Sequence, residues 1–279
     1  MIGVFDSGFG GLAVLRELVR ALPNYRYGYL GDNAQAPYGS RSEEEIFRFT
    51  RAGVEHLFGR GAELVILACN TASAGALRRI QQEVLPLYQQ KPFDAAQGKR
   101  VLGIIIPTAE EIVAKSKSGA VGILATEATV RSGAYAREIQ KLSPKMKIYQ
   151  EACPRLVPMI EMGAMDGEGF GRAAKAHVKN LLSRRPKIDT VVLGSTHYAA
   201  AREHIAAHFP RKVALVSQGE LVAKKLGEYL KRHPELEVRL ARGGGRAFFS
   251  TERSDRVDRL GSLFYGAPIE FKKVRIAAD

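Results

Sequence analysis

Residues 64–71 read Leu64-Val-Ile-Leu-Ala-Cys69-Asn70-Thr71, and residues 190–198 read Thr190-Val-Val-Leu-Gly-Ser195-Thr196-His197-Tyr198. Each stretch is an apolar, β-branched run that stops at a small residue, a nucleophile-type side chain and a Thr. An α/β protein carries its chemistry on the loops at the carboxyl ends of its strands. Two such ends facing one cleft would place two unlike groups, the Cys69 thiol and the Ser195 hydroxyl, on opposite sides of a ligand.

Apolar runs of this kind recur along the chain and alternate with segments of helical period. The runs are Ile2–Phe5, Tyr25–Leu30, Leu64–Ala68, Val101–Ile106, Ala120–Ala125, Lys147–Ala152, Thr190–Gly194, Val213–Ser217 and a short Ala247–Thr251. Between two of them, Ser42 and Glu45 form a capping box that opens a helix running to about Phe58. Regular alternation implies parallel sheets with right-handed crossovers, so we predict an α/β fold with mainly parallel sheets.

The polar stretch 89–100, with Pro92 and Gly98, indicates a surface loop or linker. Before and after residue 97 the chain follows the same plan, a strand closing on a nucleophile-type residue. We therefore predict two pseudo-symmetric domains with the active-site cleft between them. The first comprises residues 1–97 plus 212–279 and carries Cys69; the second comprises residues 98–211 and carries Ser195.

Bulk properties narrow the class of protein. A chain of 279 residues that is 46% hydrophobic can bury a sizeable core. No apolar run reaches the length of a bilayer, and the sequence begins with a strand rather than a signal peptide, so we expect no membrane partner. Two cysteines without paired spacing argue against a disulfide framework or a metal site and fit the cytoplasm. The net charge of +13 is scattered along helices without a basic block, which favours solvated surfaces over a nucleic-acid partner.

A glycine-rich turn, residues 6–11, follows the first strand and opens a helix. Its glycines permit tight turning and close approach of a ligand, and its spacing is not that of the dinucleotide fingerprint. Such a turn is most often only a turn, but the Asp6 carboxylate at a strand end can hold an ammonium group or tune a neighbouring acid. On the next loop, Gly31-Asp32 and Pro37-Tyr38-Gly39 are typical of a turn with a packing tyrosine.

Cys69 stands where a strand stops and a helix begins. The positive end of a helix dipole favours the thiolate, whereas a free cysteine is otherwise often a small buried hydrophobe. His197 follows the second strand end and could exchange protons near neutral pH, although a lone histidine more often serves packing. Cys153, between a strand and prolines, is better interpreted as buried structure.

A hydroxyl-rich turn between a strand and a helix contains Thr126, Thr129, Ser132 and Tyr135. Such a turn is suited to binding a carboxylate. The alternative is ordinary helix capping by Thr129.

Taken together, these residues resemble the glutamate racemase family within the aspartate/glutamate racemase superfamily. The resemblance runs from about Ile2 to Tyr198. The matching pieces, in the order that the family uses, are Asp6-Ser7-Gly8 with Gly10-Gly11, Gly31-Asp32, Pro37-Tyr38-Gly39, Ala68-Cys69-Asn70-Thr71, Thr126 with Thr129, Cys153-Pro154 with Val157-Pro158 and Glu161, and Leu193-Gly194 with Thr196-His197-Tyr198.

The resemblance implies an isomerase that needs no cofactor and binds glutamate in a cleft between two α/β domains. One cysteine removes the α-proton and a second returns a proton to the opposite face, giving D-glutamate for peptidoglycan synthesis; we also expect a homodimer. By this resemblance Cys69 is one base, assisted by Asp6, while Glu161 and His197 assist the opposite side. The residues implied to line the substrate are Asp6, Ser7, Tyr38, Gly39, Asn70, Thr71, Thr126, Thr129, Thr196 and His197.

Two positions depart from the family pattern: Ser195, where the family has cysteine, and Ile106, where many relatives carry an acid. Losing a positioned acid or base costs roughly 10²–10⁴-fold in rate. Three accounts of Ser195 remain open: an engineered replacement in a true racemase, a natural serine through which His197 relays a proton slowly, or a protein that uses Cys69 for one-sided exchange or only binds an amino acid. Two further alternatives are a racemase that acts on another acidic amino acid or a related carboxylate, and a regulatory protein that kept the cleft.

Overall fold

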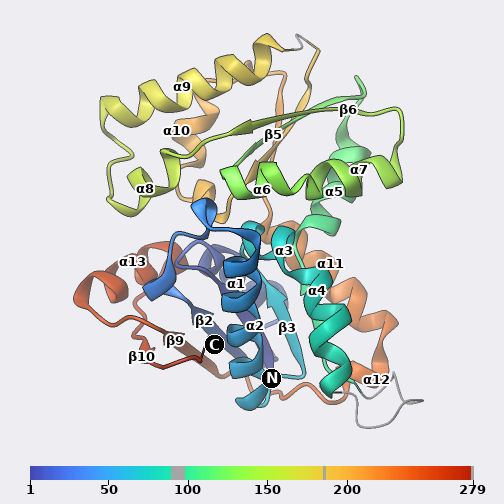
Figure 1. The fold of residues 1–279 in the computed structure, drawn as a ribbon, viewed down its shortest axis with the longest axis vertical. Coiled ribbons are helices and arrows are strands. Elements are labelled where there is room, and N and C mark those ends of the chain that lie inside the picture. Colours follow the sequence, from blue (N-terminus) through green and yellow to red (C-terminus); the bar gives the residue numbers. More distant parts are fainter. Residues whose placement is uncertain (89–97, 185–186, 278–279) are drawn as a thin grey trace.

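The computed structural model describes residues 1–88, 98–184 and 187–277, and its strands form two separate sheets (Figure 1). The strands of the larger sheet are β1 (Ile2–Asp6), β2 (Tyr27–Gly31), β3 (Leu64–Leu67), β4 (Arg100–Gly103), β9 (Arg246–Ser250) and β10 (Lys272–Lys273). Their order is β10-β9-β2-β1-β3-β4, with every neighbouring pair parallel. The predicted α/β class with mainly parallel sheets is confirmed.

The smaller sheet repeats the arrangement of the larger one. Its strands are β5 (Ala120–Ala125), β6 (Lys147–Ala152), β7 (Thr190–Gly194) and β8 (Ala214–Val216). Their order, β6-β5-β7-β8, is that of β2-β1-β3-β4, and these pairs are parallel too. In this repeat β7 occupies the place of β3, so Ser195 and Cys69 follow equivalent strands.

Sheet membership differs from the domain boundaries predicted from the sequence. β4 pairs with β3 in the first sheet, although it falls in the predicted second domain. β8 pairs with β7 in the second sheet, although it falls in the predicted first domain. The chain thus leaves the larger sheet only after β4, and it leaves the smaller sheet only after β8. Residues 89–97, on which the first boundary was placed, lie outside the described residues.

Helices cover both faces of each sheet (Figure 1). The helices are α1 (Gly11–Ala21), α2 (Glu43–Gly59), α3 (Asn70–Gly75), α4 (Leu77–Arg79), α5 (Ile105–Lys115), α6 (Glu127–Ser132), α7 (Ala134–Leu142), α8 (Leu156–Glu161), α9 (Glu168–Ser183), α10 (Arg202–Ala206), α11 (Gly219–Arg232), α12 (Pro234–Glu237) and α13 (Asp255–Tyr265). None of the described helices is long and apolar enough to cross a membrane.

The core follows the two-residue alternation of the strands. Ile2 and Val4 of β1 pack in one cluster with residues of α1, α11 and α13, whereas Phe5 packs on the opposite face with residues of α2 and α3. In the smaller sheet, Leu124 shares a cluster with α9, and Ile123 packs with α5 and α7. Both faces of both sheets are therefore buried, as parallel sheets require.

Two local predictions have opposite outcomes. The capping box is confirmed: Ser42 accepts a hydrogen bond from the Glu45 backbone N–H, and the Glu45 carboxylate accepts one from the Ser42 N–H. The strand predicted over Val101–Ile106 is wrong at its end, because α5 begins at Ile105. Pro107 lies in the first turn of that helix, where proline has no hydrogen bond to lose, and a short apolar run does not distinguish a strand from a buried helix start.

Candidate active site

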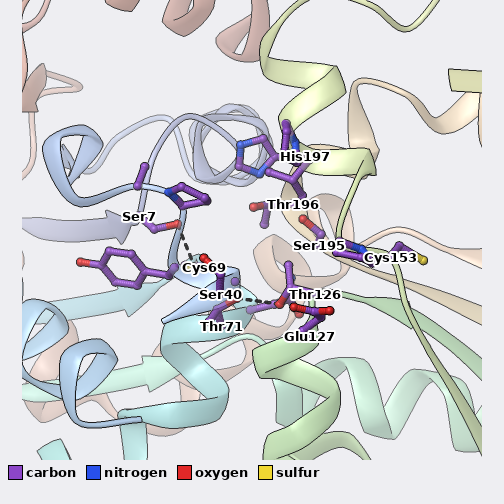
Figure 2. Close-up of a pocket in the computed structure, with 18 of the residues that line it drawn as sticks. Ser7, Ser40, Cys69, Thr71, Thr126, Glu127, Cys153, Ser195, Thr196 and His197 are labelled. Atoms are coloured by element: carbon purple, nitrogen blue, oxygen red, sulfur yellow. Dashed lines mark hydrogen bonds between the residues drawn. The ribbon is translucent and has the colours of Figure 1, made fainter. Parts of the chain in front are cut away.

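A cavity of about 260 Å³ lies between the two sheets, where the carboxyl ends of β1, β3, β5, β6 and β7 meet. Figure 2 shows Ser7 and Cys69 on one side of this cavity and Ser195 and Cys153 on the other. The residues predicted for the site that line it are Ser7, Tyr38, Gly39, Cys69, Asn70, Thr71, Thr126, Glu161, Ser195, Thr196 and His197. The lining described here contains no Lys or Arg.

Cys69 lies two residues after the end of β3 and is the N-cap of α3. Its Sγ accepts a hydrogen bond from the Ala72 backbone N–H at 3.4 Å and lies 3.4 Å from the Ser7 Oγ. Burial, followed by the nearby charge of Asp6, raises the pKa of the thiol to about 11. The helix start favours the thiolate in the predicted direction, since the hydrogen bonds from Ser7 and the Ala72 N–H lower the pKa of the thiol, but burial and the charge of Asp6 raise it by more.

Asp6 lies behind the cavity wall and is fully buried. Its Oδ1 accepts a hydrogen bond from the Gly8 N–H at 2.8 Å, and its Oδ2 accepts one from the Thr196 hydroxyl at 3.4 Å. Burial raises the pKa of this carboxyl, opposed by His197 and the Gly8 N–H. Asp6 does not line the cavity, so it acts on Cys69 through charge and on Thr196 through a hydrogen bond.

On the opposite side, the ring of His197 is held by Glu161. The distance from His197 Nε2 to Glu161 Oε1 is 2.9 Å, and the His197 ring packs edge-on against Phe264. Burial alone would raise the pKa of Glu161, but the hydrogen bond and charge of His197 outweigh it, so this pKa is lowered. In the described part of the chain the hydrogen bond of His197 therefore goes to Glu161 and not to Ser195.

The loop after β2 contributes Tyr38 and Gly39. The Tyr38 hydroxyl donates to Asp32 Oδ2 at 2.7 Å, and the Thr251 hydroxyl donates to Asp32 Oδ1 at 2.8 Å. Gly39 approaches the second sheet closely: a Cβ there would lie 3.0 Å from Thr126 Cβ. A side chain at this point, where the two halves of the site meet, would therefore press on Thr126.

Thr129 and the hydroxyl-rich turn are placed differently from the prediction. Thr126, not Thr129, caps α6 by accepting the Thr129 N–H. Thr129 is fully buried and does not line the cavity; its hydroxyl lies 3.3 Å from Thr71 Oγ1. Tyr135 is fully buried as well and reaches Asn70. Of the two predicted threonines, Thr126 and Thr129, only Thr126 lines the cavity and is in position to touch a ligand.

Several lining residues were not predicted from the sequence. They are Ala36, Pro37, Ser40, Glu127, Cys153, Pro154, Val157 and Pro158. Ser40 and Glu127 directly follow predicted residues, so extending two motifs by one position would have found them. Cys153 lines the cavity, but its Sγ donates to the Glu151 carbonyl at 3.6 Å and points away from Cys69 (Figure 2). Burial raises its pKa to about 12.

Comparison with known proteins gives a consistent result. The Asp/Glu/hydantoin racemase family matches residues 2–226. A glutamate racemase of Caulobacter sp. (strain K31) is 42% identical over 97% of this chain and 99% of its own, and one of Aquifex aeolicus (strain VF5) is 34% identical over 97% of this chain and 96% of its own.

Among solved structures, glutamate racemase isoform RacE1 from Bacillus anthracis superposes with a TM-score of 0.87 at 30% identity and covers 99% of this chain and 97% of its own. The enzyme from Francisella tularensis subsp. tularensis SCHU S4, solved in complex with D-glutamate, has a TM-score of 0.83 at 30% identity, with 98% of this chain and 97% of its own covered. The similarity therefore extends over both sheets and the cavity between them.

Proposed function

The chain belongs to the Asp/Glu/hydantoin racemase family, and we propose that it interconverts L- and D-glutamate without a cofactor. The observation that carries the proposal is the placement of Cys69 and Ser195 after equivalent strands on two sides of one cavity. Inverting a carbon centre requires a group that removes the proton from one face and another that returns a proton to the other. Two sheets of like order, with their carboxyl ends facing each other, supply that arrangement.

The polar lining supports an amino-acid substrate with two carboxylates. Hydroxyl and amide donors surround the cavity, from Ser7, Ser40, Asn70, Thr71 and Thr126. Such neutral donors bind a carboxylate by hydrogen bonds and leave the pocket free of a competing fixed cation. The buried Asp6 and the Glu161 carboxylate provide the negative charge that favours the substrate ammonium group.

Cys69 acts as the base on its side of the substrate. The C–H bond at Cα breaks, the proton passes to the Cys69 sulfur, and the electron pair stays on the substrate, delocalised into the α-carboxylate. The raised pKa of the Cys69 thiol, about 11, opposes this step. A bound ammonium group in the cavity offsets the negative charge of Asp6 behind its wall and so lowers the pKa of the thiol.

Ser195 stands on the side from which the proton returns. A hydroxyl is a much weaker proton acid than a thiol, so we propose that protonation from this face limits the overall rate. His197 is engaged by Glu161 at 2.9 Å, which favours slow return of a proton over an efficient relay through Ser195. One-sided exchange catalysed by Cys69 is the second candidate function, and the Ser195 hydroxyl is the observation that favours it.

One experiment separates these functions. L- and D-glutamate are each incubated with the protein in D₂O, while Cα deuteration is followed by NMR and inversion by circular dichroism. We expect deuteration without loss of configuration to be faster than inversion for one enantiomer only. The Ser195→Cys variant is expected to invert both enantiomers roughly 10²–10⁴-fold faster than the wild-type protein.

The controls are a thiol placed elsewhere and removal of the base. Ser183→Cys adds a thiol on the exposed end of α9 and is expected to leave both rates unchanged. Cys69→Ala is expected to abolish exchange and inversion. If neither enantiomer exchanges its α-proton in the wild-type protein or in Ser195→Cys, the protein is not a glutamate racemase.

We also propose that the enzyme works in the cytoplasm as a homodimer and supplies D-glutamate for peptidoglycan. Its two cysteines are both free and buried, which suits a reducing compartment. Size-exclusion chromatography with light scattering tests the dimer. A monomer at micromolar concentration would contradict it.

A further inference from the structure

Gln218 links the wall of the cavity to the two chain segments that connect the sheets. It lies between β8 and α11, is 5% exposed, and is the N-cap of α11. Its Oε1 accepts a hydrogen bond from Asn70 Nδ2 at 2.7 Å. Its Nε2 lies 3.0 Å from Asn70 Oδ1, 3.0 Å from Thr108 Oγ1 and 2.8 Å from the Tyr135 hydroxyl oxygen.

The donors and acceptors of this cluster fix how the Asn70 amide is turned. The Thr108 hydroxyl donates to the Ile104 carbonyl at 2.6 Å, so toward Gln218 it accepts. The Tyr135 hydroxyl donates to Asn70 Oδ1 at 2.6 Å, so it also accepts from Gln218. Asn70 Oδ1 is thus occupied on the buried side, and one of the two Nδ2 hydrogens is used by Gln218.

The second Nδ2 hydrogen of Asn70 has no acceptor among the hydrogen bonds of the described residues. Asn70 lines the cavity and directly follows Cys69. An amide held on its buried side therefore presents one N–H to the ligand space. A carboxylate oxygen is the acceptor that such a donor binds best.

The position of the cluster in the fold explains why it holds Asn70 firmly. Asn70 begins α3 beside the first sheet, and Tyr135 lies on α7 beside the second. Thr108 lies on α5, in the connection that leaves the first sheet, and Gln218 lies in the connection that returns to it. In Figure 1 these helices, α3, α5, α7 and α11, gather where the two halves of the molecule join.

We propose that Gln218 is a positioning residue for the reaction: its side-chain amide fixes the Asn70 amide so that one N–H faces a carboxylate of the bound amino acid. This inference rests on the proposed function, because it names the group that glutamate meets beside Cys69. Removing a buried partner leaves Asn70 free to turn and leaves polar atoms unsatisfied. The consequence falls on glutamate binding more than on the chemistry of the thiol.

The test is a double-mutant cycle read out by calorimetric titration with D-glutamate and by KM and kcat of Cα deuteration. Gln218→Met keeps the length of the side chain and removes its hydrogen bonds. We expect it to weaken glutamate binding and raise KM roughly 5- to 100-fold with a smaller change in kcat. In an Asn70→Ala background the same substitution is expected to add little, because Gln218 acts through Asn70.

Two further variants keep the test decisive. Gln81→Met removes a glutamine that donates to the Val101 carbonyl away from the cavity, and it is expected to bind glutamate like the wild-type protein. Tyr135→Phe removes the other donor to Asn70 Oδ1 and is expected to show the same loss of binding and the same non-additivity with Asn70→Ala. It replaces Gln218→Met if thermal unfolding shows that the latter does not fold.

The outcomes are distinguishable. If the wild-type protein binds glutamate and neither Gln218→Met nor Tyr135→Phe binds it more weakly, the inference is overturned and the proposed function stands. An equal loss in the wild-type and Asn70→Ala backgrounds also overturns it, since the effect would then not pass through Asn70. If the wild-type protein neither binds glutamate nor exchanges its α-proton, the proposed function fails and the inference fails with it.

Discussion

Replacing Asp6 by asparagine should make the Cys69 thiol ionise more readily. The pKa of this thiol rises from 9.0 to about 11, because of burial first and the charge of Asp6 second. Since each pKa unit is a tenfold change in ionisation, the shift leaves about 100-fold less thiolate at neutral pH. A negative charge opposes a second one nearby, so Asp6→Asn should restore roughly tenfold of that thiolate and leave the part due to burial.

The assay is the pH dependence of alkylation by iodoacetamide, with modification of Cys69 and Cys153 quantified separately by peptide mass spectrometry. We expect the Cys69 profile of Asp6→Asn to move to lower pH than that of the wild-type protein. The pKa of Asp6 is itself raised by burial, so at acidic pH, where this carboxyl becomes neutral, the two profiles should converge.

The matched control is Asp166→Asn, which removes a carboxylate on the surface next to His204. Its Cys69 profile should coincide with that of the wild-type protein. If Asp6→Asn leaves the Cys69 profile in place or moves it to higher pH, the charge of Asp6 does not raise the thiol pKa. Burial alone would then account for the shift, and the electrostatic role given to Asp6 would be wrong.

Three further substitutions test the packing around the cavity and the stability of helix α2. Gly10→Ala would place a methyl group 2.8 Å from the His197 backbone N, so kcat/KM for glutamate should fall about 100-fold in the racemisation assay. Gly53→Ala, in the middle of α2, drives a methyl group into the buried Phe5 ring and should destabilise the protein by about 1–3 kcal/mol in urea unfolding. Its control is Gly59→Ala, at the end of the same helix, where a methyl group would meet no atom within 4 Å and should not destabilise the protein. Ser42→Ala removes the cap of α2 and should lower the unfolding free energy by about 1 kcal/mol in the same experiment.

Features set by neighbouring residues could be predicted from the sequence. Ser42 and Glu45 are three positions apart, and their mutual hydrogen bonds need only a helix start, so the capping box was predictable. The ends of β3 and β7 were predictable as well, because an apolar run that stops at Cys69 or Ser195 is a local signal. The resulting expectation, that the two side chains face one cavity, agrees with their place in the structure.

Features set by distant residues could not be predicted in the same way. A parallel strand does not reveal its neighbour, since its pairing is made across a long connection; the sequence therefore did not indicate that β4 pairs with β3 and β8 with β7. Asn70 and Gln218 are 148 positions apart, and nothing near either residue indicates the pair. The raised pKa of Cys69 has the same origin, because burial and Asp6 come from the assembled fold rather than from the helix start.

The place of β9 in the larger sheet has a consequence for how the chain becomes functional during its synthesis. β9 is made after both β2 and the whole second sheet, yet it pairs with β2 along Tyr27–Gly31. Until it emerges from the ribosome, the outer edge of β2 has no partner and is open to pairing with other chains. Thr251, just after β9, also supplies the hydrogen bond to the carboxylate that holds Tyr38. A nascent chain can therefore complete its second sheet first, but it acquires a finished substrate pocket only when its last segment docks.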